Sequence, residues 1–116
     1  MRVSQMHVWV MGSAWRNLTF LQLTTDEGLI GISECRISNR TQALLGYLEE
    51  AKNRYILGTD PFRIEHTVLR MFRDDYGRVG QVVATAIALV EIACWDIIGK
   101  ATNRAVYELL GGAVRD

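Results

Sequence analysis

Two side chains with complementary acid–base chemistry, Asp96 and Lys100, stand four residues apart in the chain. On a helix this spacing places both on one face, where they can form either a proton-transfer pair or a local ion pair. Ion pairs of this kind are common on ordinary helix surfaces and carry no reaction by themselves. We therefore interpret Asp96 and Lys100 as a structural ion pair.

Two other carboxylates, Glu34 and Glu91, could also act as acids or bases. Glu91 lies inside the most apolar stretch of the chain, where burying a carboxylate without a partner would be costly. Neither residue has a His, a Lys or a second acid at a spacing that indicates an acid–base site. We expect structural roles for both, and we assign no catalytic and no metal-binding residue to the chain.

The apolar stretch around Glu91 predicts one long helix. Between Gly80 and Lys100 the only formal charges are Glu91 and Asp96, and most other residues are apolar. A membrane span is the rival interpretation, but the run is short for a bilayer and contains two acids. We expect a core helix with more apolar surface than a small domain can cover, and hence self-association of the isolated chain.

The first third of the chain predicts three strands. Residues alternate in character over Val3–Met11, and a second strand is expected over Leu18–Thr25 and a third over Leu29–Cys35. The polar segment Gly12–Asn17 separates the first two strands as a loop. Asp26–Gly28 is a tight connection, so the second and third strands should form an antiparallel hairpin.

The remaining segments predict shorter helices. One has its apolar stripe at Leu44, Leu48, Ala51 and Tyr55, with Asn39 and Gln42 placed to cap its start. A second should begin with Asp60 as N-cap and Pro61 in the first helical position. Its expected buried side consists of Ile64, Val68, Met71 and Phe72. The predicted fold class is α+β, a three-stranded antiparallel meander followed by a helical bundle.

Size and charge narrow the function classes. A chain of 116 residues suits one domain, and its 13 basic and 13 acidic residues balance, so nothing attracts it to nucleic acid or an anionic membrane. Cys35 and Cys94 are too few for a disulfide framework and lack metal-ligand spacing. No secretory signal is visible, because Gln5 and His7 interrupt the N-terminal apolar residues, so we expect a cytoplasmic protein.

A distinctive pattern lies in the long helix and the segment after it. It reads Ala-Ile-x-x-x-Glu-Ile-Ala-x-Trp-Asp-Ile-x-Gly-Lys-Ala from Ala86 to Ala101, and the run Val106–Gly112 closes it. Together with the Thr-x-Asp-Glu-Gly turn and the order of strands and helices, it resembles the N-terminal capping domain of the enolase superfamily, in its mandelate racemase-like branch. Ala105 stands where that family often has Pro, a difference that affects the stiffness of a turn and no chemistry.

The resemblance implies that residues 1–116 are a capping domain. In the superfamily, a Lys or His base removes the proton alpha to a carboxylate, and a metal ion holds the enediolate. Those bases and the metal-binding carboxylates belong to a (β/α) barrel, which needs about 250 residues and is absent from this chain. We therefore expect magnesium in the barrel of the parent enzyme, no cofactor bound by this chain, and no activity of the chain alone.

The resemblance also implies roles for two loops, which in the family close over the mouth of the barrel and contact the distal end of the substrate. They correspond here to Gly12–Asn17 and Arg36–Thr41. The implied substrate-binding residues are Trp15, Arg16, Arg36 and Arg40, with Tyr76 and Arg78 as outside candidates. Arginines present several donors to hydroxyls or a carboxylate, and an indole forms a flat apolar wall. Each could instead be a solvated loop residue.

The arginine-bearing loops favour a hydroxylated substrate, so we expect the parent enzyme to be an acid-sugar dehydratase, a carbon–oxygen lyase. Its expected partners are the barrel domain, a sugar acid and further copies of the same chain. A racemase or epimerase and a cycloisomerase on the same scaffold remain alternatives. From a different class, the chain could be a free-standing helical interaction module, in which case no reading frame for a barrel would follow Asp116.

Overall fold

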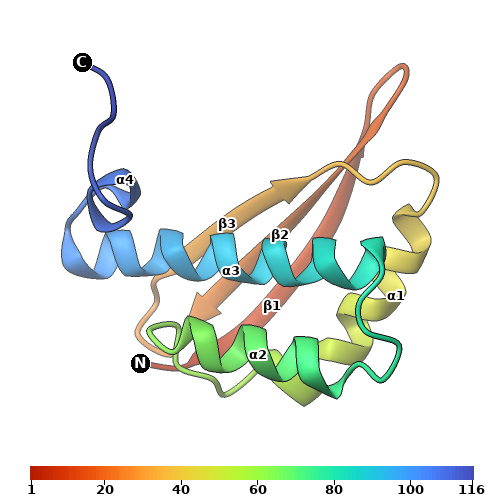
Figure 1. Ribbon diagram of the computed structural model, residues 1–116, viewed down its shortest axis with the longest axis horizontal. Helices are drawn as coiled ribbons and strands as arrows, with labels where there is room; N and C mark the ends of the chain where they lie inside the picture. The colour runs from red at the N-terminus through yellow and green to blue at the C-terminus, as the bar shows by residue number, and fades with distance from the viewer.

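The computed structural model describes every residue from Met1 to Asp116 and has the predicted α+β architecture (Figure 1). The strands are β1 (Val3–Gly12), β2 (Asn17–Thr25) and β3 (Ile30–Cys35). The helices are α1 (Thr41–Ala51), continued by the π-helical turn η1 (Lys52–Ile56), then α2 (Ile64–Asp74), α3 (Gln81–Thr102) and α4 (Val106–Leu109).

The three strands form one antiparallel meander in the order β1-β2-β3. Trp9 lies opposite Phe20, which in turn lies opposite Glu34, and the Trp9 and Phe20 rings stack with centroids 5.5 Å apart. Gly28 adopts a φ of 84° in the turn between β2 and β3, a conformation that glycine takes without strain. The predicted hairpin at Asp26–Gly28 is therefore confirmed.

The helix α3 crosses the sheet and packs on β3 and β2, and it also contacts α1, α2 and α4 (Figure 1). By length and composition α3 could also cross a membrane, but half of its apolar window is buried inside the fold. Its buried residues are Ala86, Ile87, Leu89, Val90, Ala93, Cys94, Ile97, Ile98 and Gly99. They join Leu21 and Leu23 of β2 and Leu44 and Leu48 of α1 in one hydrophobic core, so α3 is the expected core helix.

The helix α3 approaches β3 closely at Gly31. A Cβ atom on Gly31 would lie 2.0 Å from the carbonyl oxygen of Ala93 and 2.7 Å from Cγ1 of Ile97. Real Cβ contacts are never this short, so only glycine allows the helix to lie directly on the strand backbone.

The ion pair between Asp96 and Lys100 holds the free edge of the same strand. Asp96 Oδ2 accepts hydrogen bonds from Lys100 Nζ at 2.8 Å and from the backbone N–H of Ile32 at 2.9 Å. Lys100 Nζ also donates to the carbonyl oxygen of Ile30 at 2.6 Å. The predicted ion pair is confirmed, and it occupies two polar groups of the β3 backbone that would otherwise be open for pairing with another strand.

Both predicted helix starts are wrong in detail. Asn39 has a φ of 59°, so it precedes the helix in a left-handed conformation, and α1 begins at Thr41 without a side-chain cap. Asp60 does accept a hydrogen bond from the N–H of Phe62, but this bond closes a turn, and α2 begins later at Ile64. Before α2, the hydrogen bonds from the N–H groups of Phe62 and Arg63 to Asp60 satisfy the backbone in a local turn.

The buried side of α2 differs from the prediction at Phe72, and Val68 is half-buried against the core rather than buried. Ile64, Thr67 and Met71 are buried, whereas Phe72 is 43% exposed. At about 100° per residue, Phe72 lies about 80° around the helix from Ile64, whereas Met71 lies within about 20° of it. The buried arc is therefore centred on Met71, and Phe72 falls at its edge.

Ala105, which stands where the family it resembles often has proline, makes a hydrogen bond at the start of α4. The backbone N–H of Ala105 donates to Glu108 Oε2 at 3.2 Å, a hydrogen bond that a proline could not make. The turn between α3 and α4 is therefore held by a side-chain hydrogen bond.

We predict that Gly31→Ala destabilises the fold by about 1–3 kcal/mol or more, because the added methyl must push α3 away from β3. The matched control is Gly46→Ala, which adds a methyl on the exposed side of α1 with nothing within 4 Å. The control should be neutral or stabilising by up to about 1 kcal/mol, since alanine favours helix. Urea unfolding of both variants tests this, and equal midpoints would contradict the close packing.

Candidate functional site

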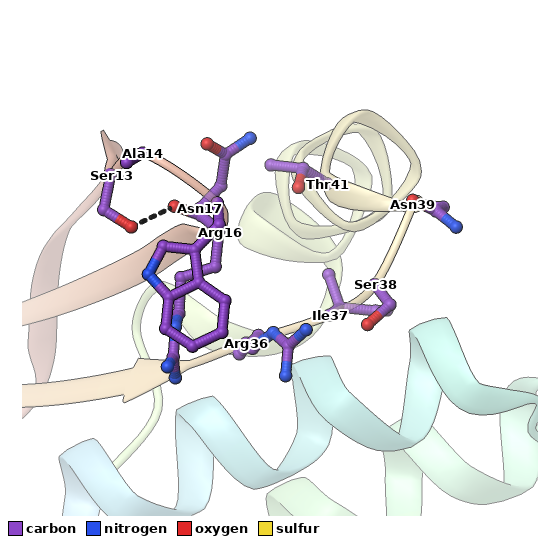
Figure 2. Close-up of a pocket in the computed structure, with 10 residues that line it drawn as sticks. Ser13, Ala14, Arg16, Asn17, Arg36, Ile37, Ser38, Asn39 and Thr41 are labelled. Carbon is purple, nitrogen blue, oxygen red and sulfur yellow. Dashed lines mark hydrogen bonds between the residues drawn. The ribbon is translucent and has the colours of Figure 1, made fainter.

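The segments that follow β1 and β3 enclose a cavity of about 340 Å³ at one end of the sheet (Figure 2). The first segment connects β1 to β2, and the second leads from β3 into α1. The lining residues are Ser13, Ala14, Trp15, Arg16, Asn17, Arg36, Ile37, Ser38, Asn39 and Thr41.

Strand register explains why these two segments meet. β1 and β2 remain paired to the end of the hairpin, where Gly12 lies opposite Asn17. β3 is antiparallel to β2 and ends with Cys35 opposite Thr19. The last residues of β1 and β3 therefore lie at the same end of the sheet. The residues that follow each strand are therefore brought together although they are about twenty positions apart in the sequence.

In the first segment, hydrogen bonds close the backbone into a turn, and the side chains of Trp15 and Arg16 are exposed. The N–H of Ser13 donates to the carbonyl oxygen of Arg16 at 2.8 Å, and Ser13 Oγ donates to the same oxygen at 2.9 Å (Figure 2). The Arg16 guanidinium lies 4.6 Å from the centroid of the Trp15 ring, a cation–π arrangement. Trp15 is 80% exposed, so this arrangement presents the indole and the guanidinium outward as one unit.

In the second segment, one residue is buried in the core and its neighbours are exposed to solvent. Ile37 is 4% exposed and belongs to the hydrophobic core, while Arg36, Ser38 and Asn39 on either side of it are exposed. Figure 2 shows Arg16 and Arg36, from the two segments, with their guanidinium groups on the same side of the cavity.

Of the predicted substrate-binding residues, Trp15, Arg16 and Arg36 line the cavity, whereas Arg40 does not. Arg40 Nη1 instead donates to Gln81 Oε1 at 3.0 Å, which ties the second segment to the first residue of α3. The outside candidates Tyr76 and Arg78 lie in the connection between α2 and α3 and take no part in this cavity.

Sequence reasoning identified both segments but not their small polar members. Ser13, Asn17, Ser38, Asn39 and Thr41 also line the cavity. In the sequence, these residues are indicated only by their position in the two segments that interrupt the strand pattern. Their residue types alone do not distinguish them from ordinary loop residues.

The lining of the cavity offers hydrogen-bond donors and positive charge and contains no His, Lys, Asp or Glu. Arg16 and Arg36 are its only charged residues, and neither has a carboxylate within 4.0 Å. The hydroxyl groups of Ser13, Ser38 and Thr41 have no His, Lys or carboxylate in the lining that could remove their protons. A ligand here would meet hydrogen-bond donors and positive charge, which suits hydroxyl groups or an anion.

The two cysteines offer no reactive thiol. Burial, with a smaller effect of Glu91, raises the pKa of the Cys94 thiol to about 12. Burial, followed by the charge of Glu34, also raises the pKa of Cys35. Since the thiolate is the nucleophilic form, both shifts disfavour reaction of these thiols at neutral pH.

Comparison with known proteins places these features in context. Residues 3–111 match the family described as mandelate racemase / muconate lactonizing enzyme, N-terminal domain. The chain is 44% identical over 104 residues to a D-galactonate dehydratase family member of Streptomyces bingchenggensis, covering 90% of this chain and 25% of that protein. It is 36% identical over 116 residues to the D-galactonate dehydratase of Klebsiella pneumoniae, covering 100% of this chain and 29% of that protein.

A solved structure shows the same fold. The crystal structure of an enolase from Agrobacterium radiobacter, with bound sodium and L-malate, superimposes with a TM-score of 0.92 at 34% identity, covering 100% of this chain and 29% of that chain. The chain therefore spans between a quarter and a third of the length of the relatives that it matches.

We predict that Trp15→Ala and Arg16→Ala each change the free energy of unfolding by no more than about 0.5 kcal/mol, because both side chains are outside the core. The control Leu21→Ala removes a fully buried side chain and should cost about 2–5 kcal/mol. Thermal or urea unfolding measures all three. Losses at Trp15 or Arg16 that match the control would mean that the first segment serves stability.

Proposed function

The chain belongs to the mandelate racemase / muconate lactonizing enzyme N-terminal domain family, and from this premise we propose that it is the substrate-capping and specificity domain of an acid-sugar dehydratase. One observation carries the proposal: two loops from different strands converge on a polar cavity with two arginines and no acid–base group. A site of this composition can select a hydroxylated acid but cannot transform it.

The reaction of the whole enzyme, in this proposal, is the elimination of water from a sugar acid. A base removes the proton alpha to the carboxylate, the hydroxyl group on the neighbouring carbon leaves as water with a proton, and the enol product tautomerises to a keto acid. The base and the proton donor would come from residues outside positions 1–116, since the chain covers 25% and 29% of the two named relatives.

Residues of this chain would bind the end of the substrate that does not react. Arg16 and Arg36 would donate hydrogen bonds to distal hydroxyl groups, and Trp15 would cover them and exclude water. The names of the relatives from Streptomyces and Klebsiella support a dehydratase over a racemase, epimerase or cycloisomerase. The absence of an apolar wall other than Trp15, Ala14 and Ile37 supports a hydroxylated substrate.

Magnesium, which the family implies, does not fit the residues of this chain. No group of three or more His, Cys, Asp or Glu side chains comes together anywhere in it. Magnesium requires several oxygen ligands in near-octahedral geometry. We therefore propose that any magnesium of the whole enzyme is held by residues outside this chain.

Location and assembly complete the proposal. A cytoplasmic location is supported by two free cysteines, which reducing conditions maintain. A homo-oligomer is supported by exposed apolar side chains, among them Ile92 on α3, which is 49% exposed.

The experiment that tests the proposed function compares the chain with the polypeptide that its own reading frame encodes beyond Asp116. The 116-residue chain alone should neither dehydrate a panel of sugar acids nor bind magnesium saturably, whereas the extended polypeptide should do both. Saturable magnesium binding by the chain, with turnover abolished by Glu91→Gln, would show that the chain contains an active site. A stop codon after Asp116 would favour the interaction module.

In the extended enzyme we predict that Arg16→Ala and Arg36→Ala each lower kcat/KM for the preferred sugar acid by roughly tenfold or more, because each removes a hydrogen bond from a charged donor. For a sugar acid without the distal hydroxyl groups, kcat/KM should fall much less in these variants, since that acid cannot accept the hydrogen bond from the arginine. The control Arg73→Ala changes an exposed arginine of α2 outside the cavity and should leave kcat/KM unchanged. Equal losses for both acids would contradict a role in reading the distal end.

We further predict that the isolated chain self-associates and that Ile92→Gln weakens the association, because the change removes exposed apolar area from α3. Leu69→Gln, an exposed apolar residue on α2, serves as the control. Sedimentation or light scattering over a wide concentration range measures the effect. A monomer at every concentration would count against an apolar contact surface on α3.

A further inference from the structure

A second cavity, of about 400 Å³, lies between the start of β1, the segment after η1 and the first two turns of α2. Arg2, Asp60, Arg63, His66 and Arg70 are its charged or titratable side chains, and one of its nine lining residues is hydrophobic. Arg2 precedes β1, whereas the first cavity, the one lined by Trp15, Arg16 and Arg36 and called the loop cavity below, follows the far end of this ten-residue strand. At about 3.3 Å per residue the two cavities are separated by roughly 30 Å.

The three arginines of this second cavity form no salt bridge within the chain. None of Arg2, Arg63 and Arg70 has a carboxylate within 4.0 Å, because the salt bridges of the chain join the N-terminus to Glu27 and Lys100 to Asp96. Asp60 is the only acidic residue in the lining, and its Oδ1 already accepts a hydrogen bond from the N–H of Phe62. Three guanidinium groups thus face one hollow with a single carboxylate among them.

Two of these arginines are held in place by uncharged partners. Arg2 Nη1 donates to the carbonyl oxygen of Gly58 at 2.8 Å. Arg70 Nη2 donates to the carbonyl oxygen of Arg54 at 3.3 Å, and its guanidinium lies 5.5 Å from the centroid of the buried Tyr55 ring. A guanidinium has five N–H donors, so each of these groups keeps free donors although its position is restricted.

The third arginine and the histidine lie at the start of α2. Arg63 directly precedes α2 as its N-cap residue, and His66 and Arg70 lie four residues apart on one face of the helix. With Arg2 from the facing segment, they surround the hollow on two sides. An arrangement of several convergent guanidinium donors without salt-bridge partners matches the chemistry of a dianionic oxyanion.

We propose that this second cavity, lined by Arg2, Arg63, His66 and Arg70, binds a small dianionic oxyanion, either a phosphate group or a dicarboxylate. The inference is independent of the proposed substrate cap, since the two cavities share no residue. An acidic protein segment is the competing occupant. The small anion is favoured because protein contacts are built around an apolar centre, and this hollow has one hydrophobic residue in nine.

The experiment follows backbone amide resonances of the 116-residue chain by NMR during titration with inorganic phosphate and, separately, with malonate. Sodium chloride at matched ionic strength controls for screening. Saturable shifts at Gly58, Thr59 and Thr67, which line the hollow, are expected with at least one probe. Saturation with phosphate alone would identify a phosphate site, with malonate alone a dicarboxylate site, and with both a general oxyanion site.

Variants locate the binding. Arg63→Gln should weaken it by roughly tenfold, the loss of one charge-assisted hydrogen bond. The Arg63 side chain makes no hydrogen bond or ion pair within the chain, so Arg63→Gln should fold normally. This variant therefore still tests binding if Arg70→Gln loosens the packing on Tyr55. Arg73→Gln, on the same helix outside the cavity, should bind as the unmodified chain does.

Three results would overturn the proposal. The first is no saturable shift with either probe. The second is equal weakening by Arg63→Gln and Arg73→Gln, which would indicate a general charge effect. The third is binding of a hexaglutamate peptide to these residues with no binding of phosphate or malonate, which would identify the hollow as a contact for an acidic protein segment.

Discussion

The contact between the backbone of β3 and the backbone of α3 at Gly31 and Ala93 is the constraint on which the rest of the fold depends. Without a side chain at Gly31, the helix lies against the strand, and Asp96 and Lys100 then reach the N–H of Ile32 and the carbonyl oxygen of Ile30. Because α1, α2 and α4 all pack on α3, the position of α3 on this strand determines where every other helix lies.

The same constraint separates the packed core from the loops. The sheet is held by α3 on one face, and the residues that follow β1 and β3 extend past the covered part of the sheet as loops. The loop cavity is anchored to the core through Ile37 and to α3 through the hydrogen bond between Arg40 and Gln81. Trp15, Arg16 and Arg36 are exposed, so these side chains can be changed while the core beneath them stays the same.

Local patterns in the sequence were sufficient for the strands, the loops and the existence of the helices, but not for the helix starts. Alternation and turn residues placed each strand to within one residue, and the stripe at Leu44, Leu48, Ala51 and Tyr55 is buried as predicted. The motif around Trp95 and Asp96 identified the family because it is long and specific. Three of the four predicted substrate-binding residues line one cavity, and their role in binding remains a prediction.

Features that depend on tertiary geometry were not predictable. Nothing near Gly31 in the sequence indicates that a helix more than sixty residues later will touch it. Arg40 resembled the other loop arginines until Gln81 supplied a partner. The second cavity joins Arg2 to Arg63 and Arg70, which share no motif and meet only because β1 starts beside the segment that leads into α2.

The most direct test of the account is a domain exchange. The D-galactonate dehydratase of Klebsiella pneumoniae, which aligns with the whole of this chain, would receive residues 1–116 in place of its corresponding segment. The measurement is the ratio of kcat/KM between D-galactonate and other sugar acids. We expect the chimera still to dehydrate sugar acids, because catalysis belongs to the recipient, and we expect its substrate ratio to change. An active chimera with an unchanged ratio would contradict the claim that this chain selects the substrate.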